Sequence, residues 1–250
     1  MATKNEWLTT NISERLTNHI VDFKATYSKH QNNFNDFTTE SQNVKWDILN
    51  NYPKLFVPLS GGMDSEYVFE QFYKEGVTPI IVSTPGNNEE SAYAFKCCEK
   101  YGAKPVVIEK TEKEILTTFC SDIFLKLNGV GYNSTPALIA ARYAQDKNGV
   151  AIIGEHGYND INEWDFYNDA ILGKDASIYY FLHTPQIVIA MRKEYEYYNT
   201  DHQSFKSKIY GIEYREKMIY QYSEKFYNIV NSLIRTKKRP NVRDIIQCEI

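Results

Sequence analysis

The sequence predicts an α/β fold, in which an open parallel sheet of about five strands carries helices on both faces. Short apolar runs alternate with amphipathic segments through residues 51–160, and turn residues separate them. This alternation is typical of parallel strands joined by right-handed helical crossovers. With 250 residues the chain can bury a sizeable core. We expect a helical segment over residues 1–50, the α/β core over 51–160 and a mostly helical part over 161–250.

The residues ahead of the core divide into an amphipathic stretch and a polar stretch. Between residues 9 and 23, apolar side chains such as Ile12, Leu16 and Ile20 recur at helical spacing. Residues 28–43 are polar and rich in Asn. We therefore expect a helix over residues 9–23 and a loop over 28–43.

Within the core, four short apolar runs predict buried strands, because strands that are covered on both faces are apolar throughout. These runs are residues 54–60, 78–84, 104–110 and 150–155. Segments with helical spacing lie between them, over residues 64–76, 88–102, 111–129 and 134–149. Gly76 and Gly102 follow two of these helices, where a glycine cap is common. Pro58, near the end of the first run, is unusual in a central strand.

The C-terminal part shows helical rather than strand patterns. Residues 178–195 and 214–234 combine apolar and charged side chains over lengths that suit helices. We expect helices over both segments and no strand after about residue 160.

The composition argues against several classes of protein. The net charge is −4, so there is no global basic field to gather nucleic acid, although residues 235–243 form a local basic patch. No apolar run approaches the length of a membrane span, and the N-terminus lacks the apolar core of a secretion signal. The four cysteines form no C-x-x-C pair of a zinc or redox site. We expect a cytoplasmic protein with reduced thiols and no membrane contact, and nucleic acid is not favoured as a partner.

The stretch Ser-Gly-Gly-Met-Asp-Ser, residues 60–65, follows the first predicted strand and leads into a helix. In an open parallel sheet, ligands bind beyond the carboxyl ends of the strands. Glycines allow close approach of the backbone to a ligand, and a helix N-terminus favours an anion. The hydroxyls of Ser60 and Ser65 can donate hydrogen bonds. The carboxylate of Asp64 fits beside a phosphate when a divalent cation lies between them, so these residues predict a Mg²⁺–polyphosphate site.

This stretch resembles the PP-loop, S-G-G-x-D-S, of the N-type ATP pyrophosphatase superfamily, and it lacks the spacing and the lysine of a Walker loop. The resemblance implies an adenine nucleotide alpha hydrolase-like fold. It also implies that ATP is split, with Mg²⁺, between its α and β phosphates while the loop holds the departing pyrophosphate. Asp64 would then be a catalytic residue and a Mg²⁺ ligand. The nucleotide-binding residues implied here are Leu59, Ser60, Gly61, Gly62, Met63, Asp64 and Ser65.

Two later segments resemble the synthetase domain of asparagine synthetase. Residues 82–86, Val-Ser-Thr-Pro-Gly, resemble the segment that lines the adenine pocket, which places Val82 against the base. Residues 233–240 resemble the family's R-x-K segment, which implies that Lys237 reaches the phosphates, with Lys238 as the second candidate. A solvated basic helix end is the structural alternative for these lysines.

A third segment, residues 151–160, resembles the family's G-E-G-x-D-E segment. Gly154 and Glu155 match, His156 replaces the second glycine, and the acidic residue comes later, at Asp160. The resemblance implies that Gly154 binds the nucleotide, that Glu155 faces the ATP site as a base or orienting group, and that Asp160 binds Mg²⁺. An exposed carboxylate at a strand end is the structural alternative for Glu155.

The resemblance as a whole predicts an ATP-dependent synthetase that forms AMP and pyrophosphate. It would adenylate a carboxylate or carbonyl oxygen of a small-molecule acceptor and transfer it to ammonia or another amine, with the adenine near Leu59 and Val82. Two alternatives stay open. One is a PP-loop enzyme that modifies tRNA, a nucleobase or a nucleotide, and the other is a module that binds an adenine nucleotide without turnover.

The start of the chain bears on the source of nitrogen. Glutamine-dependent asparagine synthetases begin with a glutaminase domain whose nucleophile is an N-terminal cysteine, whereas this chain begins Met-Ala-Thr-Lys. We expect free ammonia, another amine or ammonia from a separate glutaminase subunit. Related synthetases often pair, so a homodimer is a further expectation.

Overall fold

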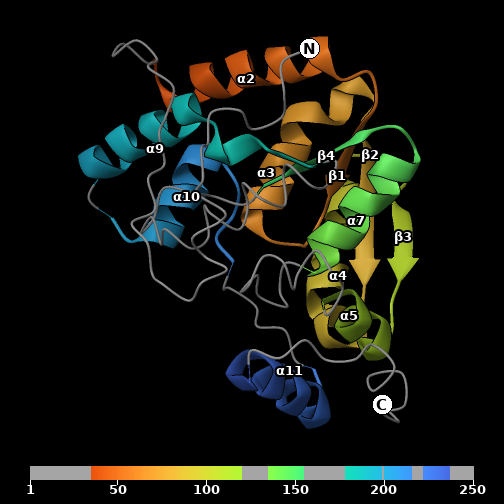
Figure 1. The fold of residues 1–250 in the computed structure, drawn as a ribbon. Helices are drawn as coiled ribbons and strands as arrows, with labels where there is room; N and C mark the ends of the chain where they lie inside the picture. Colours follow the sequence, from red (N-terminus) through yellow and green to blue (C-terminus); the bar gives the residue numbers. More distant parts are fainter. Residues whose placement is uncertain (1–34, 120–134, 155–177, 199, 216–221, 237–250) are drawn as a thin grey trace.

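A computed structural model of the chain describes residues 35–119, 135–154, 178–198, 200–215 and 222–236. At its centre is a five-stranded sheet in the order β3-β2-β1-β4-β5, and every neighbouring pair is parallel (Figure 1). The strands are β1 (Leu55–Pro58), β2 (Thr78–Ser83), β3 (Val106–Glu109), β4 (Val150–Ile153) and β5 (Ile178–Tyr180). The predicted parallel α/β sheet is thus confirmed.

Helices connect and cover these strands. The described α-helices are α2 (Phe37–Asn51), α3 (Met63–Phe72), α4 (Asn88–Lys100), α5 (Glu112–Phe119), α7 (Thr135–Asp146), α9 (Pro185–Tyr198), α10 (His202–Tyr210) and α11 (Glu224–Thr236). Short 3₁₀ turns are η1 (Tyr73–Glu75), η2 (Pro85–Asn87) and η4 (Phe181–His183). Gly76 and Gly102 adopt left-handed φ values of 75° and 63° after η1 and α4, as the sequence predicts.

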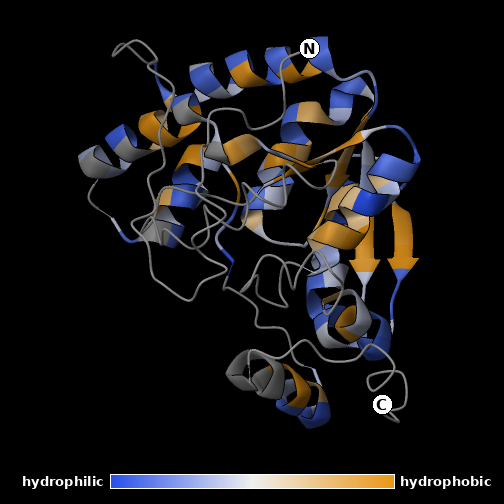
Figure 2. Ribbon diagram, viewed as in Figure 1, coloured by the Kyte–Doolittle hydropathy of each residue, from blue (hydrophilic) through white to orange (hydrophobic). Residues whose placement is uncertain are grey.

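The sheet separates two apolar clusters, which confirms helices on both faces. Along β1, Leu55 and Val57 join the cluster that contains α2, α3, α4, α9 and α10. Phe56, which points the other way, joins the cluster of α5, α7 and α11. Figure 2 shows β2 and β3 as mostly hydrophobic ribbons, while the helices alternate between hydrophobic and hydrophilic residues. The apolar strands are therefore the middle layer of three.

Pro58 fits a central strand because of where the pairing of β1 ends. On the β2 side the register continues through Pro58, opposite Ile80. On the β4 side it ends at Phe56, opposite Ala151. The next amide, of Leu59, donates to the carbonyl of Ile80 at 2.8 Å. Alternate amides face alternate neighbours, so the missing N–H of Pro58 lies on the side where the ladder has already stopped.

Helix α2 corrects the loop predicted over residues 28–43, because α2 begins inside that stretch. Asp36 caps it, and its carboxylate accepts the amide of Thr39 at 2.9 Å. The buried residues are Phe37, Glu40, Ser41, Val44 and Ile48. In the first two turns, Phe37 is the only buried residue that is apolar. The helical spacing of apolar residues is therefore weak in this part of the sequence. The helix predicted over residues 9–23 lies outside the described residues.

Strand β5 corrects the helix predicted from residue 178 and the expectation of no strand after about residue 160. Ile178 pairs with Ala151 and Tyr180 with Ile153. Both side chains are buried, with exposures of 0% and 1%. Three residues are too few to show a period, although Ile and Tyr favour strands. The sheet thus extends beyond the residues 51–160 expected to form the core. The helical part of the expected segment is α9.

Within the part of the chain that the structure describes, no helix is both long enough and apolar enough to cross a bilayer.

Candidate functional site

The strand order defines a switch point between β1 and β4. From β1 the chain first builds outward through β2 and β3, and it then returns to the other side of β1 to place β4 and β5. In such sheets a crevice opens at the carboxyl ends of the two strands where the order reverses. Residues 59–62 follow β1 at this edge, and Gly154 follows β4. The sheet therefore brings together two of the segments singled out in the sequence.

Hydrogen bonds inside the loop fix its shape. The Ser65 hydroxyl donates to the Gly62 carbonyl at 2.9 Å, and the Ser60 amide donates to Ser65 Oγ at 3.2 Å. The two hydroxyl oxygens are 3.1 Å apart, and the Gly62 amide donates to Ser60 Oγ at 3.3 Å. The two serines, which were expected to donate to a phosphate, thus also hold the loop in place before any ligand binds.

Two glycines allow the close approaches that the loop needs. Gly61 has φ +87°, and a Cβ there would lie 2.2 Å from the carbonyl oxygen of Glu90 on α4. A Cβ on Gly154 would lie 2.4 Å from the carbonyl oxygen of Asp64. Side chains at either position would push the loop or the end of β4 away from its neighbour. Gly154 therefore has a packing role next to the loop.

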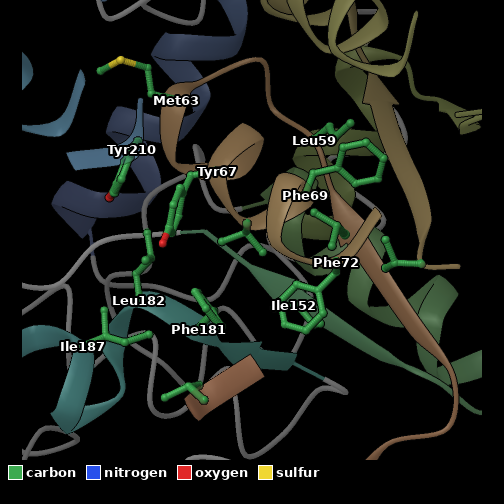
Figure 3. Close-up of a cluster of buried hydrophobic side chains, with 14 of the residues drawn as sticks. Leu59, Met63, Tyr67, Phe69, Phe72, Ile152, Phe181, Leu182, Ile187 and Tyr210 are labelled. Carbon is green, nitrogen blue, oxygen red and sulfur yellow. The ribbon is translucent and has the colours of Figure 1, made fainter. Parts of the chain in front are cut away.

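Helix α3 starts directly at the loop. Its N-cap is Gly62, which has no side chain that could cap the first-turn amides. The first-turn amides of a helix have no partner within the helix, and the helix dipole adds partial positive charge there. This end of α3 is therefore suited to an anion. Met63, in contrast, is buried and belongs to the apolar cluster drawn in part in Figure 3.

Asp64 has partners on α10 that the sequence analysis missed. Lys206 Nζ lies 2.5 Å from one carboxylate oxygen, and the Tyr210 hydroxyl donates to the other at 2.8 Å. The side chain of Lys206 is only 3% exposed and that of Asp64 is 21% exposed. Tyr210 stacks on Tyr67 of α3 with ring centroids 4.4 Å apart, as Figure 3 shows. Helix α10 thus places a buried cation beside the loop.

The donor set at Asp64 is compatible with Mg²⁺ bound together with phosphate. Mg²⁺ commonly uses one or two carboxylates, with phosphate and water oxygens completing the octahedron. Within the described ranges no three His, Cys, Asp or Glu side chains gather into a metal cluster. One carboxylate at a phosphate loop meets the need for a protein ligand.

A second acidic residue of α3, Glu66, is linked to the loop through Arg215. Its side chain is 3% exposed and pairs with Lys100 of α4 at 3.0 Å. It also pairs with Arg215, whose other guanidinium nitrogen donates to the carbonyl oxygen of Gly61 at 2.8 Å. Neither Glu66 nor Arg215 was singled out in the sequence, because nothing in a one-dimensional pattern joins residues 149 positions apart.

The turn after β2 is held by hydrogen bonds of Asn87 and is partly covered by the ring of Tyr222. The side chain of Asn87 accepts the amide of Thr84 at 2.7 Å and donates to the carbonyl of Val82 at 3.1 Å. The ring of Tyr222 lies on Gly86, where a Cβ would come within 2.6 Å of it. Val82 and Leu59 are both buried, and they belong to clusters on opposite faces of the sheet. The structure does not bring these two side chains together, and their contact with adenine stays a prediction.

The remaining candidates lie outside the described residues: Glu155, Asp160, Lys237 and Lys238. Their roles stay predictions. The cysteines within the described residues, Cys97 and Cys98, are free and buried. Burial raises the pKa of the Cys97 thiol to about 12 and that of Cys98 to about 11, so both are neutral at pH 7.

No protein-family model matches the sequence, and no curated protein sequence is detectably similar to it. Among solved structures, the chain can be aligned with that of NMN synthetase from Francisella tularensis. The alignment has 15% sequence identity and a TM-score of 0.38, and it covers 83% of this chain and 98% of that one. Similarity at this level supports no conclusion about activity.

Proposed function

We propose that the chain is an ATP-dependent synthetase that forms AMP and pyrophosphate. It activates a carboxylate or carbonyl oxygen of a small molecule by adenylation and transfers the activated group to ammonia or another amine. One observation carries the proposal: a complete S-G-G-x-D-S loop lies at the carboxyl end of β1, at the switch point of the sheet and at the start of α3, whose N-cap is a glycine.

The loop offers what a pyrophosphate group requires. The start of α3 supplies backbone amides and the positive end of a helix dipole. Lys206 supplies a positive charge that is almost fully excluded from water. Asp64 would hold Mg²⁺, which neutralises negative charge on the phosphates when it is bound. Groups that are fixed before the reaction stabilise a leaving anion without reorganisation, which is the larger part of catalysis in phosphoryl and nucleotidyl transfer.

The proposed reaction has two steps. The acceptor oxygen attacks the α-phosphorus, the bond from that phosphorus to the bridging oxygen breaks, and pyrophosphate leaves from the loop. An amine then attacks the activated carbon, loses a proton, and AMP leaves with the acceptor oxygen. Glu155 would take the proton or orient the amine, Lys237 would contact the departing pyrophosphate with Lys238 as the second candidate, and Asp160 would share the metal. Free ammonia, or ammonia from a separate subunit, would serve as the nitrogen source.

The experiment is a screen for pyrophosphate release from ATP and Mg²⁺. Pools of amino acids, nucleotides, nucleosides and tRNA are each added with and without ammonium. We expect release with one small-molecule pool and a further dependence on ammonium or an amine. Release only with tRNA would favour a tRNA-modifying enzyme. Tight ATP binding without release from any pool would favour a module that binds nucleotides without turnover.

A further inference from the structure

Arg215 joins the segment after α10 to the loop. One guanidinium nitrogen donates to the carbonyl oxygen of Gly61 at 2.8 Å, and another pairs with the carboxylate of Glu66. The guanidinium also lies over the ring of Tyr93 on α4, 5.3 Å from its centroid. A planar guanidinium can make these contacts at once because its donors point in fixed, different directions. The side chain thus links the loop, α3 and α4.

The carbonyl that Arg215 holds belongs to the peptide between Gly61 and Gly62. The amide of the same peptide, on Gly62, donates to Ser60 Oγ at 3.3 Å. The C=O and N–H of a trans peptide point in opposite directions, so contacts at both ends fix the orientation of the whole plane. Glycine is the residue that most easily permits such a plane to rotate, since it has no Cβ to oppose either orientation. The loop therefore needs an external contact to keep one orientation.

We propose that Arg215 is a positioning residue that prevents rotation of the Gly61–Gly62 peptide and so keeps the loop in the form that binds polyphosphate. The ligand in this inference rests on the proposed function. In a rotated peptide the carbonyl oxygen would take the direction of the amide, which would present a negative dipole within an anion-binding loop. Loss of Arg215 would thus weaken polyphosphate binding without removing any group that touches the ligand.

Glu66 holds the guanidinium of Arg215 in position. Its carboxylate is buried, and it is held from the other side by Lys100 at 3.0 Å. Lys100 is 54% exposed along its side chain and bonds to the same carboxylate as Arg215. The two cations therefore share one anion, whereas the hydrogen bond to the Gly61 carbonyl comes from Arg215. This difference provides a matched control.

The test compares Arg215→Met, Arg215→Lys and Lys100→Met by titration calorimetry with inorganic pyrophosphate and with AMP, both with Mg²⁺. Circular dichroism confirms that each variant is folded, and Arg215→Lys keeps the charge if Arg215→Met unfolds. We expect both Arg215 variants to bind pyrophosphate about tenfold more weakly or worse, because a lysine cannot reach Gly61 and Glu66 together. Lys100→Met should stay within about threefold of the wild type, and AMP binding should change little in all variants.

Equal pyrophosphate affinity in the wild type and the Arg215 variants would overturn the inference and leave the proposed function standing. An equal loss in Lys100→Met would also overturn it, because the effect would then act through Glu66 rather than through the Gly61 carbonyl. If the wild type binds neither pyrophosphate nor AMP, the proposed function itself fails, and the inference fails with it.

Discussion

Gly61→Ala is expected to destabilise the protein by about 2–5 kcal/mol. The φ of +87° is unfavourable for any residue with a Cβ, and the added methyl group would lie 2.2 Å from the carbonyl oxygen of Glu90. Backbone atoms of a helix cannot move aside cheaply, so either the loop or the start of α4 must shift. Urea unfolding followed by circular dichroism measures the change, and pyrophosphate affinity should fall with it.

Gly76→Ala is the control for this prediction. Gly76 has a similar φ of +75°, but nothing lies within 4 Å of the position of its Cβ. The substitution there should reduce the free energy of unfolding only by the cost of a left-handed backbone for a residue with a Cβ, about 1–2 kcal/mol. The difference between the two variants isolates the close approach of the loop to α4. If the two variants unfolded at the same urea concentration, the close approach of Gly61 to Glu90 would add nothing to the cost of the substitution, which contradicts the prediction.

Asp64→Ala is expected to have the second large effect, a loss of about 3–5 kcal/mol in the free energy of unfolding. The change leaves the ammonium of Lys206 without its carboxylate, although that side chain is only 3% exposed. The hydroxyl of Tyr210 loses its acceptor as well. Because Asp64 itself is 21% exposed, solvent can reach the site and the loss should lie toward the lower end. Thermal and urea unfolding provide the measurement.

A double-mutant cycle with Lys206→Met separates the ion pair from other effects. Methionine keeps the apolar stem of lysine and carries no charge. The variant with both changes should therefore be more stable than Asp64→Ala alone, because the buried ammonium is removed together with the carboxylate that it pairs with. Additive losses in the double variant would show that the contact between Asp64 and Lys206 contributes no coupling energy.

The sequence predicts the strands of the sheet well, and for a physical reason. Residues 79–82, at the centre of β2, are apolar throughout because the sheet is covered on both faces there, and a glycine cap such as Gly76 marks where the chain leaves a helix. The N-terminal turns of α2 were missed because two polar residues, Glu40 and Ser41, occupy buried positions there. Strand β5 was missed because its three residues are too short to show a pattern.

In the candidate site, too, some residues can be predicted from the sequence and others cannot. The loop could be read from the sequence because its residues are consecutive, and the parallel sheet then brings Gly154 beside it. Lys206 and Arg215 could not be found in this way, since they reach the loop through the packing of α10 and the segment after it. Their partners Asp64 and Glu66 are 142 and 149 residues away in the chain. The contacts of Gly61 with α4 depend on tertiary structure as well.

The central claim is that the loop holds the pyrophosphate part of ATP, and competition between the two ligands tests it most directly. ATP with Mg²⁺ is bound to the wild-type protein and inorganic pyrophosphate is titrated in, with bound ATP followed by equilibrium dialysis of a labelled nucleotide. We expect pyrophosphate to displace ATP competitively and Arg215→Lys to weaken the binding of both ligands together. ATP that stays bound at saturating pyrophosphate, or that does not bind at all, would show that the loop does not hold the pyrophosphate part of ATP.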